Sequence, residues 1–210
     1  MIYLIGGPPR GGKTTLARRL SETAAIPYFS FDHLVSLITP YVAKGEVVER
    51  FPLRAALREA EFSNDAFYAK YSSREAVDLY LRQAESCWPG IDNFLRYSLA
   101  GEHELILEGW QVLPRLLGEN FARTDRDKLR TVFLVRHDQK KIVEGIRSDP
   151  SKHNWAANNT NDERTYGRIA DMIILFGETV EREAVSCNLD VADTDQDFAG
   201  TIDGLVEAWR

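Results

Sequence analysis

Short apolar runs alternate along the chain with longer stretches in which apolar residues recur at helical spacing. The runs Ile2–Ile5, Leu105–Leu107 and Thr131–Val135 are nearly continuous, which is typical of strands buried on both faces. Ile26–Phe31 and a weaker run, Leu189–Ala192, predict two more strands. Strands that alternate with helices predict an α/β fold with a five-stranded, mainly parallel sheet.

The longest interval without a strand signal covers residues 41–100, and its apolar spacing is helical. Ser72 and Glu75 have the spacing of a capping box and predict the start of a helix there. Trp88-Pro89-Gly90 predicts the end of that helix, and Ile91–Leu99 predicts another one. An interval of this length is too long for a plain crossover, so we expect a helical insertion within a single domain of residues 1–210.

Composition and charge argue against some classes of binding partner. The chain has 26 basic and 32 acidic side chains and a net charge of −6, which argues against nucleic acid or an anionic membrane surface. No apolar run approaches the ~18 residues of a membrane-spanning helix. The chain shows no secretory leader, and its two cysteines cannot form a disulfide framework, so we expect a cytoplasmic protein.

The segment Gly7-Pro8-Pro9-Arg10-Gly11-Gly12-Lys13-Thr14 matches the pattern G-x-x-x-x-G-K-[ST] directly between a predicted strand and a predicted helix. Backbone N–H groups of such a glycine-rich turn, together with the positive end of the helix dipole, can surround a polyphosphate. Lys13 would then bridge the β- and γ-phosphates, and the Thr14 hydroxyl would bind Mg²⁺. We expect Mg²⁺ and ATP as cofactors, with the nucleotide contacted by Gly7, Pro8, Pro9, Arg10, Gly11, Gly12, Lys13, Thr14 and Thr15.

With this motif the chain resembles the small P-loop kinases of the nucleoside-monophosphate-kinase-like class. The segment Phe31-Asp32-His33-Leu34 is similar to the one after the second strand in chloramphenicol phosphotransferases, and residues 105–114 are similar to the third-strand segment of 2-phosphoglycerate kinases. The resemblance implies a three-layer α/β/α P-loop NTPase fold. It also implies that Asp32 acts as a base on an acceptor hydroxyl, and that a lid carries arginines.

Three side chains are predicted near the phosphate because ligands collect at the carboxyl ends of parallel strands. Asp32 is interpreted either as the catalytic base that also contacts the acceptor or as an N-cap. Glu108 either holds a Mg²⁺-bound water or the acceptor, or is a structural hydrogen-bond acceptor. Trp110 either offers a flat face to the acceptor or packs in the core.

A polar segment, Ser148–Asp162, is rich in Asn, Asp and Ser, and we interpret residues of about 148–164 as the lid. Arg164 is the expected transfer residue, Arg147 is expected at the nucleotide and Arg168 at the acceptor, because cations stabilise the charge on a transferring phosphoryl group. Each could instead be a solvated surface arginine. Asp193-Thr194 either adjoin the adenine or cap the last helix.

Three functions therefore remain open from the sequence. The first is an ATP-dependent kinase that transfers the γ-phosphate to a hydroxyl of a small-molecule acceptor. The second is a nucleotide or nucleoside kinase, and the third is a binding or regulatory protein that ATP switches without chemistry. Asp32 discriminates a kinase from the switch, because a base is needed to activate a hydroxyl but not to change conformation.

Overall fold

A computed structural model describes residues 1–121, 125, 127–152 and 154–210. Its sheet contains β1 (Ile2–Gly6), β2 (Tyr28–Ser30), β3 (Leu105–Glu108), β4 (Leu129–Val135) and β5 (Asp190–Asp193). Their order is β2-β3-β1-β4-β5 and all neighbouring strands are parallel, which confirms the predicted α/β class. All five predicted strands are present, with ends that differ by up to two residues.

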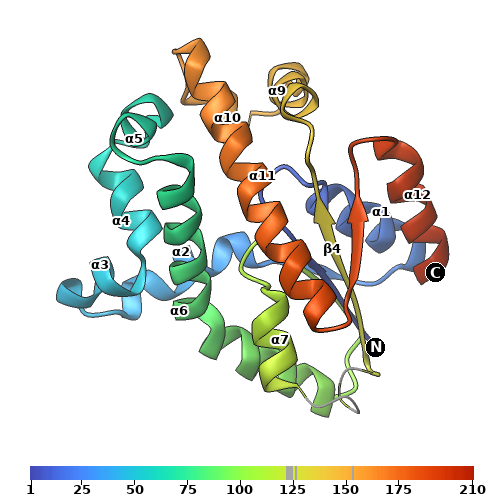
Figure 1. The fold of residues 1–210 in the computed structure, drawn as a ribbon. Helices are drawn as coiled ribbons and strands as arrows, with labels where there is room; N and C mark the ends of the chain where they lie inside the picture. The colour runs from blue at the N-terminus through green and yellow to red at the C-terminus, as the bar shows by residue number, and fades with distance from the viewer. Residues whose placement is uncertain (122–124, 126, 153) are drawn as a thin grey trace.

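Helices cover both faces of this sheet (Figure 1). Along β1, Ile2 and Leu4 face one apolar cluster while Tyr3 and Ile5 face the other, as the two-residue period of a strand requires. The helices are α1 (Lys13–Ala24), α2 (Leu34–Ile38), α3 (Val47–Arg50), α4 (Pro52–Glu59), α5 (Asn64–Lys70), α6 (Ser73–Ala100), α7 (Pro114–Asn120), α9 (Gln139–Ser148), α10 (Trp155–Asn158), α11 (Glu163–Ser186) and α12 (Phe198–Trp209).

The smaller cluster lies between the sheet and helices α1 and α12, and the larger one lies between the sheet and helices that include α6, α7, α9 and α11. This gives the expected three layers, with β1 in the middle of the sheet. Over the described residues, no helix combines the length and apolar character needed to cross a membrane.

The regular structure within residues 41–100 is helical. Short 3₁₀ turns at Thr39–Tyr41 and Lys44–Glu46 precede α3. Ser72 and Glu75 form the predicted capping box at the start of α6. Figure 1 shows α3, α4 and α5 on the side of the molecule opposite α12, while the long α6 runs from that side down to α7.

The predicted break at Trp88-Pro89-Gly90 is wrong, because α6 continues through Pro89 to Ala100. Pro89 lies on the exposed side of this helix, whereas Trp88, Ile91 and Leu95 are buried in the larger cluster. A proline inside a helix removes one backbone hydrogen bond and costs about 3 kcal/mol. Burial of the apolar side chains on either side of Pro89 offsets this cost.

Candidate active site

A cavity of about 1090 Å³ opens where the carboxyl ends of the strands meet the helices of residues 41–100. Its loop side is formed by Pro9, Arg10, Gly12, Lys13, Thr14, Thr15, Arg18, Arg136, Gly145, Asp149 and Phe198. Its helix side is formed by Val35, Leu53, Arg54, Leu57, Phe62, Asn64, Tyr80, Gln83 and Trp110. Asp32 lies at the base, and Ser151, Trp155 and Asn159 come from the polar segment.

The glycine-rich loop lies directly against β4. Gly7 has a φ of 120°, and a Cβ added there would lie 2.1 Å from the carbonyl oxygen of Leu134. Gly12, with a φ of 100°, is the N-cap of α1. These two positions require glycine because other residues rarely adopt such backbone angles. The turn and the start of α1 together form the arrangement that binds polyphosphates at a helix N-terminus.

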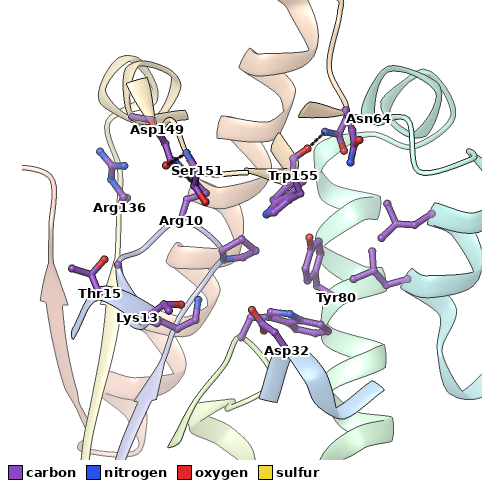
Figure 2. Close-up of a pocket in the computed structure, with 18 of the residues that line it drawn as sticks. Arg10, Lys13, Thr15, Asp32, Asn64, Tyr80, Arg136, Asp149, Ser151 and Trp155 are labelled. Atoms are coloured by element: carbon purple, nitrogen blue, oxygen red, sulfur yellow. Dashed lines mark hydrogen bonds and ion pairs between the residues drawn. The ribbon is translucent and has the colours of Figure 1, made fainter. Parts of the chain in front are cut away.

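Lys13 and Asp32 lie close together at the base of the cavity (Figure 2). The Lys13 ammonium donates to the carbonyl oxygen of Pro8 over 2.7 Å. Burial lowers the pKa of Lys13, and the charges of Asp32 and Glu108 oppose this shift. Lys13 is therefore a buried cation whose nearest charges are two carboxylates.

Asp32 is open to the cavity but has protein atoms around its other sides. This restricted hydration raises its pKa to about 6; Lys13 lowers it and Glu108 raises it further. The side chain of Ser30, rather than that of Asp32, caps the 3₁₀ turn at Phe31–His33, and α2 has no side-chain cap. The N-cap interpretation of Asp32 is therefore wrong, and its carboxylate is available to a ligand.

Glu108 ends β3 and is 1% exposed. The Thr14 hydroxyl donates to its Oε1 over 3.2 Å, while its Oε2 is buried and has no hydrogen-bond partner. An unpartnered buried carboxylate oxygen beside a hydroxyl is a donor set of the kind that Mg²⁺ prefers. Thr14 and Glu108 thus fit the predicted metal ion, either directly or through water.

Two arginines on the loop side are already paired with carboxylates. Arg10 donates to Asp149 over 2.7 Å and to the carbonyl oxygen of Gly145 over 2.9 Å. Its side chain therefore points toward the end of α9, and a contact with nucleotide stays a prediction. Arg136, which sequence reasoning missed, pairs with Asp195 over 2.8 Å. Its signal was its position directly after the fourth predicted strand.

The Asp195 carboxylate binds the residues that follow β4. Burial alone would raise its pKa, but hydrogen bonds from the backbone N–H groups of Asp138 and His137, and from Arg136, keep the pKa below its ordinary value. Neither Asp193 nor Thr194 caps the last helix, contrary to one of the two interpretations, because Asp197 does so.

The three arginines assigned to the lid lie outside the residues that line the cavity. Arg147 pairs with Glu163 and covers the ring of Tyr166 at 5.1 Å. Arg164 points into solvent with 88% of its side chain exposed, and Arg168 donates to the carbonyl oxygen of Tyr68. Their catalytic and binding roles stay predictions that would require a rearrangement of this segment.

The polar segment instead contributes Trp155, whose ring points into the cavity above Tyr80 (Figure 2). Asn64, which is 2% exposed, donates to the carbonyl oxygen of Trp155 and to the Thr160 hydroxyl, each over 3.0 Å. The Asp65 carboxylate accepts from the backbone N–H of Asn161 over 2.8 Å. Helix α5 and the polar segment are thus joined across the mouth of the cavity. Sequence reasoning missed this contact, as well as Trp155 and Asn64.

The helix side is mostly apolar and aromatic. Tyr80 and Trp110 meet edge to face with ring centroids 4.9 Å apart, and Trp110 is 9% exposed. Trp110 therefore packs in the core, as one of its two interpretations holds, and also presents part of its surface to the cavity. Leu53 and Leu57 of α4 add further apolar surface.

Comparison with known proteins identifies solved structures of similar fold. No protein-family model and no curated protein matches the chain. Among solved structures, a "putative kinase" from Chloroflexus aurantiacus J-10-fl is 16% identical with a TM-score of 0.52, over 100% of this chain and 96% of that one. A shikimate kinase from Bacteroides thetaiotaomicron (15% identity, TM-score 0.48, 100% and 96% covered) and a gluconokinase from Sinorhizobium meliloti 1021 (12%, 0.45, 99% and 94%) are less similar.

The chain therefore has the three-layer α/β/α P-loop NTPase fold that the sequence resemblance implied. At these identities the likeness concerns the fold alone, so the chemistry has to be argued from the cavity.

Proposed function

We propose that this protein is a kinase that transfers the γ-phosphate of Mg·ATP to a hydroxyl group of a small molecule. The observation that carries the proposal is the position of Asp32, whose carboxylate faces the same cavity as Lys13 and lies between the glycine-rich loop and the helix side. A nucleotide-binding switch has no need for a base at this position.

In the proposed reaction the triphosphate lies along the glycine-rich loop, and Lys13 moves from the Pro8 carbonyl oxygen to the phosphates. The acceptor hydroxyl lies against Asp32, which takes its proton. The hydroxyl oxygen forms a bond to the γ-phosphorus, the bond from that phosphorus to the bridging oxygen breaks, and ADP leaves. Thr14 and Glu108 would hold Mg²⁺, which would supply positive charge to neutralise the phosphates.

The loop side also offers a place for the base of the nucleotide. Phe198 lies against Gly12, Arg136 lines the same cavity, and Asp195 orients Arg136. A flat base could pack against Phe198, and a guanidinium can stack on its face.

The test is acceptor-dependent formation of ADP from Mg·ATP with a panel of hydroxylated metabolites and antibiotics. We expect at least one acceptor to raise ADP formation above hydrolysis, and Asp32→Asn to abolish this increase while ATP still binds. A chain that binds ATP but shows no acceptor-dependent turnover, or one in which Asp32→Asn is fully active, would contradict the proposal and favour a switch.

A further inference from the structure

The helix side of the cavity contains a cation with no carboxylate partner. Arg54 of α4 donates through Nη1 to the Ser36 hydroxyl over 3.2 Å, and its Nε is buried without any hydrogen-bond partner. No ion pair to Arg54 exists among residues 1–121, 125, 127–152 and 154–210. Burial lowers the pKa of Arg54, and the charge of Arg58 lowers this pKa further.

The other cations around the cavity are accounted for. Arg10 and Arg136 are paired with Asp149 and Asp195, and Lys13 lies near two carboxylates. Arg18 is exposed to water and donates to the Tyr28 hydroxyl, so it needs no counter-ion. An unpaired guanidinium at a partly buried position costs free energy of folding, and such costs in proteins commonly mark a ligand site.

The groups around Arg54 favour the same kind of ligand. The Gln83 Oε1 is occupied because it accepts from the backbone N–H of Arg54 over 2.9 Å, so the amide nitrogen of Gln83 is the part left for a ligand. The Tyr80 hydroxyl also faces the cavity (Figure 2). Among the described residues that line the helix side, Arg54, Gln83 and Tyr80 offer donors to a ligand, whereas Asn64 already donates to Trp155 and Thr160, and no carboxylate is present apart from Asp32 at the base.

Arg54 is also correctly placed for an acceptor. Its partner Ser36 belongs to α2, which begins two residues after Asp32, and Arg54 and Asp32 line the same cavity, so this cavity could hold both ends of a small molecule. We propose that the acceptor carries an anionic group, a carboxylate or a phosphate, that binds the Arg54 guanidinium while its hydroxyl lies at Asp32. This inference rests on the proposed function and names the chemical class of its substrate.

The experiment measures the melting temperature of the protein saturated with Mg·AMPPNP, a non-hydrolysable ATP analogue that fills the loop side. Benzoate and phenyl phosphate are the anionic probes, and benzamide is the neutral match. We expect at least one anion, but not benzamide, to raise the melting temperature, and Arg54→Met to weaken that apparent affinity about tenfold or more. A rise in melting temperature with benzoate indicates a carboxylate on the acceptor, and a rise with phenyl phosphate indicates a phosphate.

Arg58→Met is the matched control, because Arg58 lies on the same helix, is exposed and does not line the cavity. Arg54→Lys retains the charge and should retain part of the response. Without probes, Arg54→Met should be at least as stable as the wild type, because it removes an unpaired cation. If it fails to fold, Arg54→Gln takes its place.

An equal response to the anions in wild type and Arg54→Met, or no response of the wild type to either anion, would overturn the inference. AMPPNP binding is measured first and separately. Its absence would refute the proposed function, whereas AMPPNP binding without an Arg54-dependent response refutes only the anionic acceptor.

Discussion

On the loop side of the cavity Arg10 and Arg136 already have carboxylate partners, whereas on the helix side Arg54 has none within the part of the chain that the structure describes. Lys13 is also paired within the loop, because its ammonium donates to the Pro8 carbonyl oxygen. A site for a nucleotide phosphate can be stable before its ligand arrives because the backbone supplies most of the donors. The helix side, in contrast, leaves the donors of Arg54 and Gln83 open, and we therefore expect these residues to select the acceptor.

The largest effect is expected from Lys13→Met. This change removes the cation that compensates the β- and γ-phosphates, so acceptor-dependent turnover should fall about 1000-fold or more. Steady-state ADP formation measures the effect, and Lys140→Met, which changes an exposed lysine, is the control. A Lys13→Met protein with turnover near that of the wild type would place the phosphate elsewhere.

Asp32→Asn should lower turnover about 100-fold or more while the affinity for Mg·AMPPNP changes little. In the wild type, kcat/KM should rise with pH and reach half its maximum near pH 6, because the base must be ionised and its pKa is about 6. A midpoint near pH 4 would show that the carboxylate is fully hydrated.

The same pKa has a consequence for stability. The pKa of Asp32 is higher in the folded protein than the ordinary 3.8, so the folded state holds this proton more tightly. Stability from this group is therefore full below pH 3.8 and declines as the pH rises through 6. Asp32→Asn should remove that decline in denaturation experiments performed at several pH values.

Glu108→Gln tests the metal site with a smaller effect. The substitution keeps the shape and can keep the hydrogen bond from Thr14, but it removes the charge beside the loop. We expect the Mg²⁺ concentration for half-maximal turnover to rise about tenfold, with little change in the KM of the acceptor. An unchanged Mg²⁺ dependence would mean that Glu108 is only a structural hydrogen-bond acceptor.

The smallest effect is expected from a change in α6, the helix that carries Tyr80 and Gln83 of the helix side. Gly90 is exposed within α6, and a Cβ added there would meet no atom within 4 Å. Gly90→Ala should raise the free energy of unfolding by about 0.5–1 kcal/mol, measured by urea denaturation, because alanine favours helix. Activity should stay the same, and a loss of stability would contradict the continuous helix.

The loop side could be predicted from sequence because its signal is local. Residues 7–14 are contiguous, and a strand and a helix flank them, so one motif specifies backbone, charge and position together. Asp32 and Glu108 could be predicted for a related reason, since parallel strands end at a common edge. The five strands could be predicted from short apolar runs in the sequence alone.

Apart from Trp110, the helix side could not be predicted, because it is assembled from residues far apart in the chain. Arg54, Gln83 and Trp155 meet at the cavity only through the packing of α4, α6 and the polar segment. Pro89 shows the same limit, because burial of its neighbours outweighs a local signal for a helix end. The lid arginines were assigned from the resemblance and from the need for cations at a transferring phosphoryl group, and nothing local in the sequence shows that Arg147 pairs with Glu163.

The most direct test of the account is a calorimetric titration of the folded protein with Mg·AMPPNP. We expect one binding site per chain in the wild type, an unchanged site in Arg54→Met and a lost or strongly weakened site in Lys13→Met. If the wild type takes up no nucleotide, or if Lys13→Met binds it equally well, the assignment of the glycine-rich loop as a triphosphate site is contradicted.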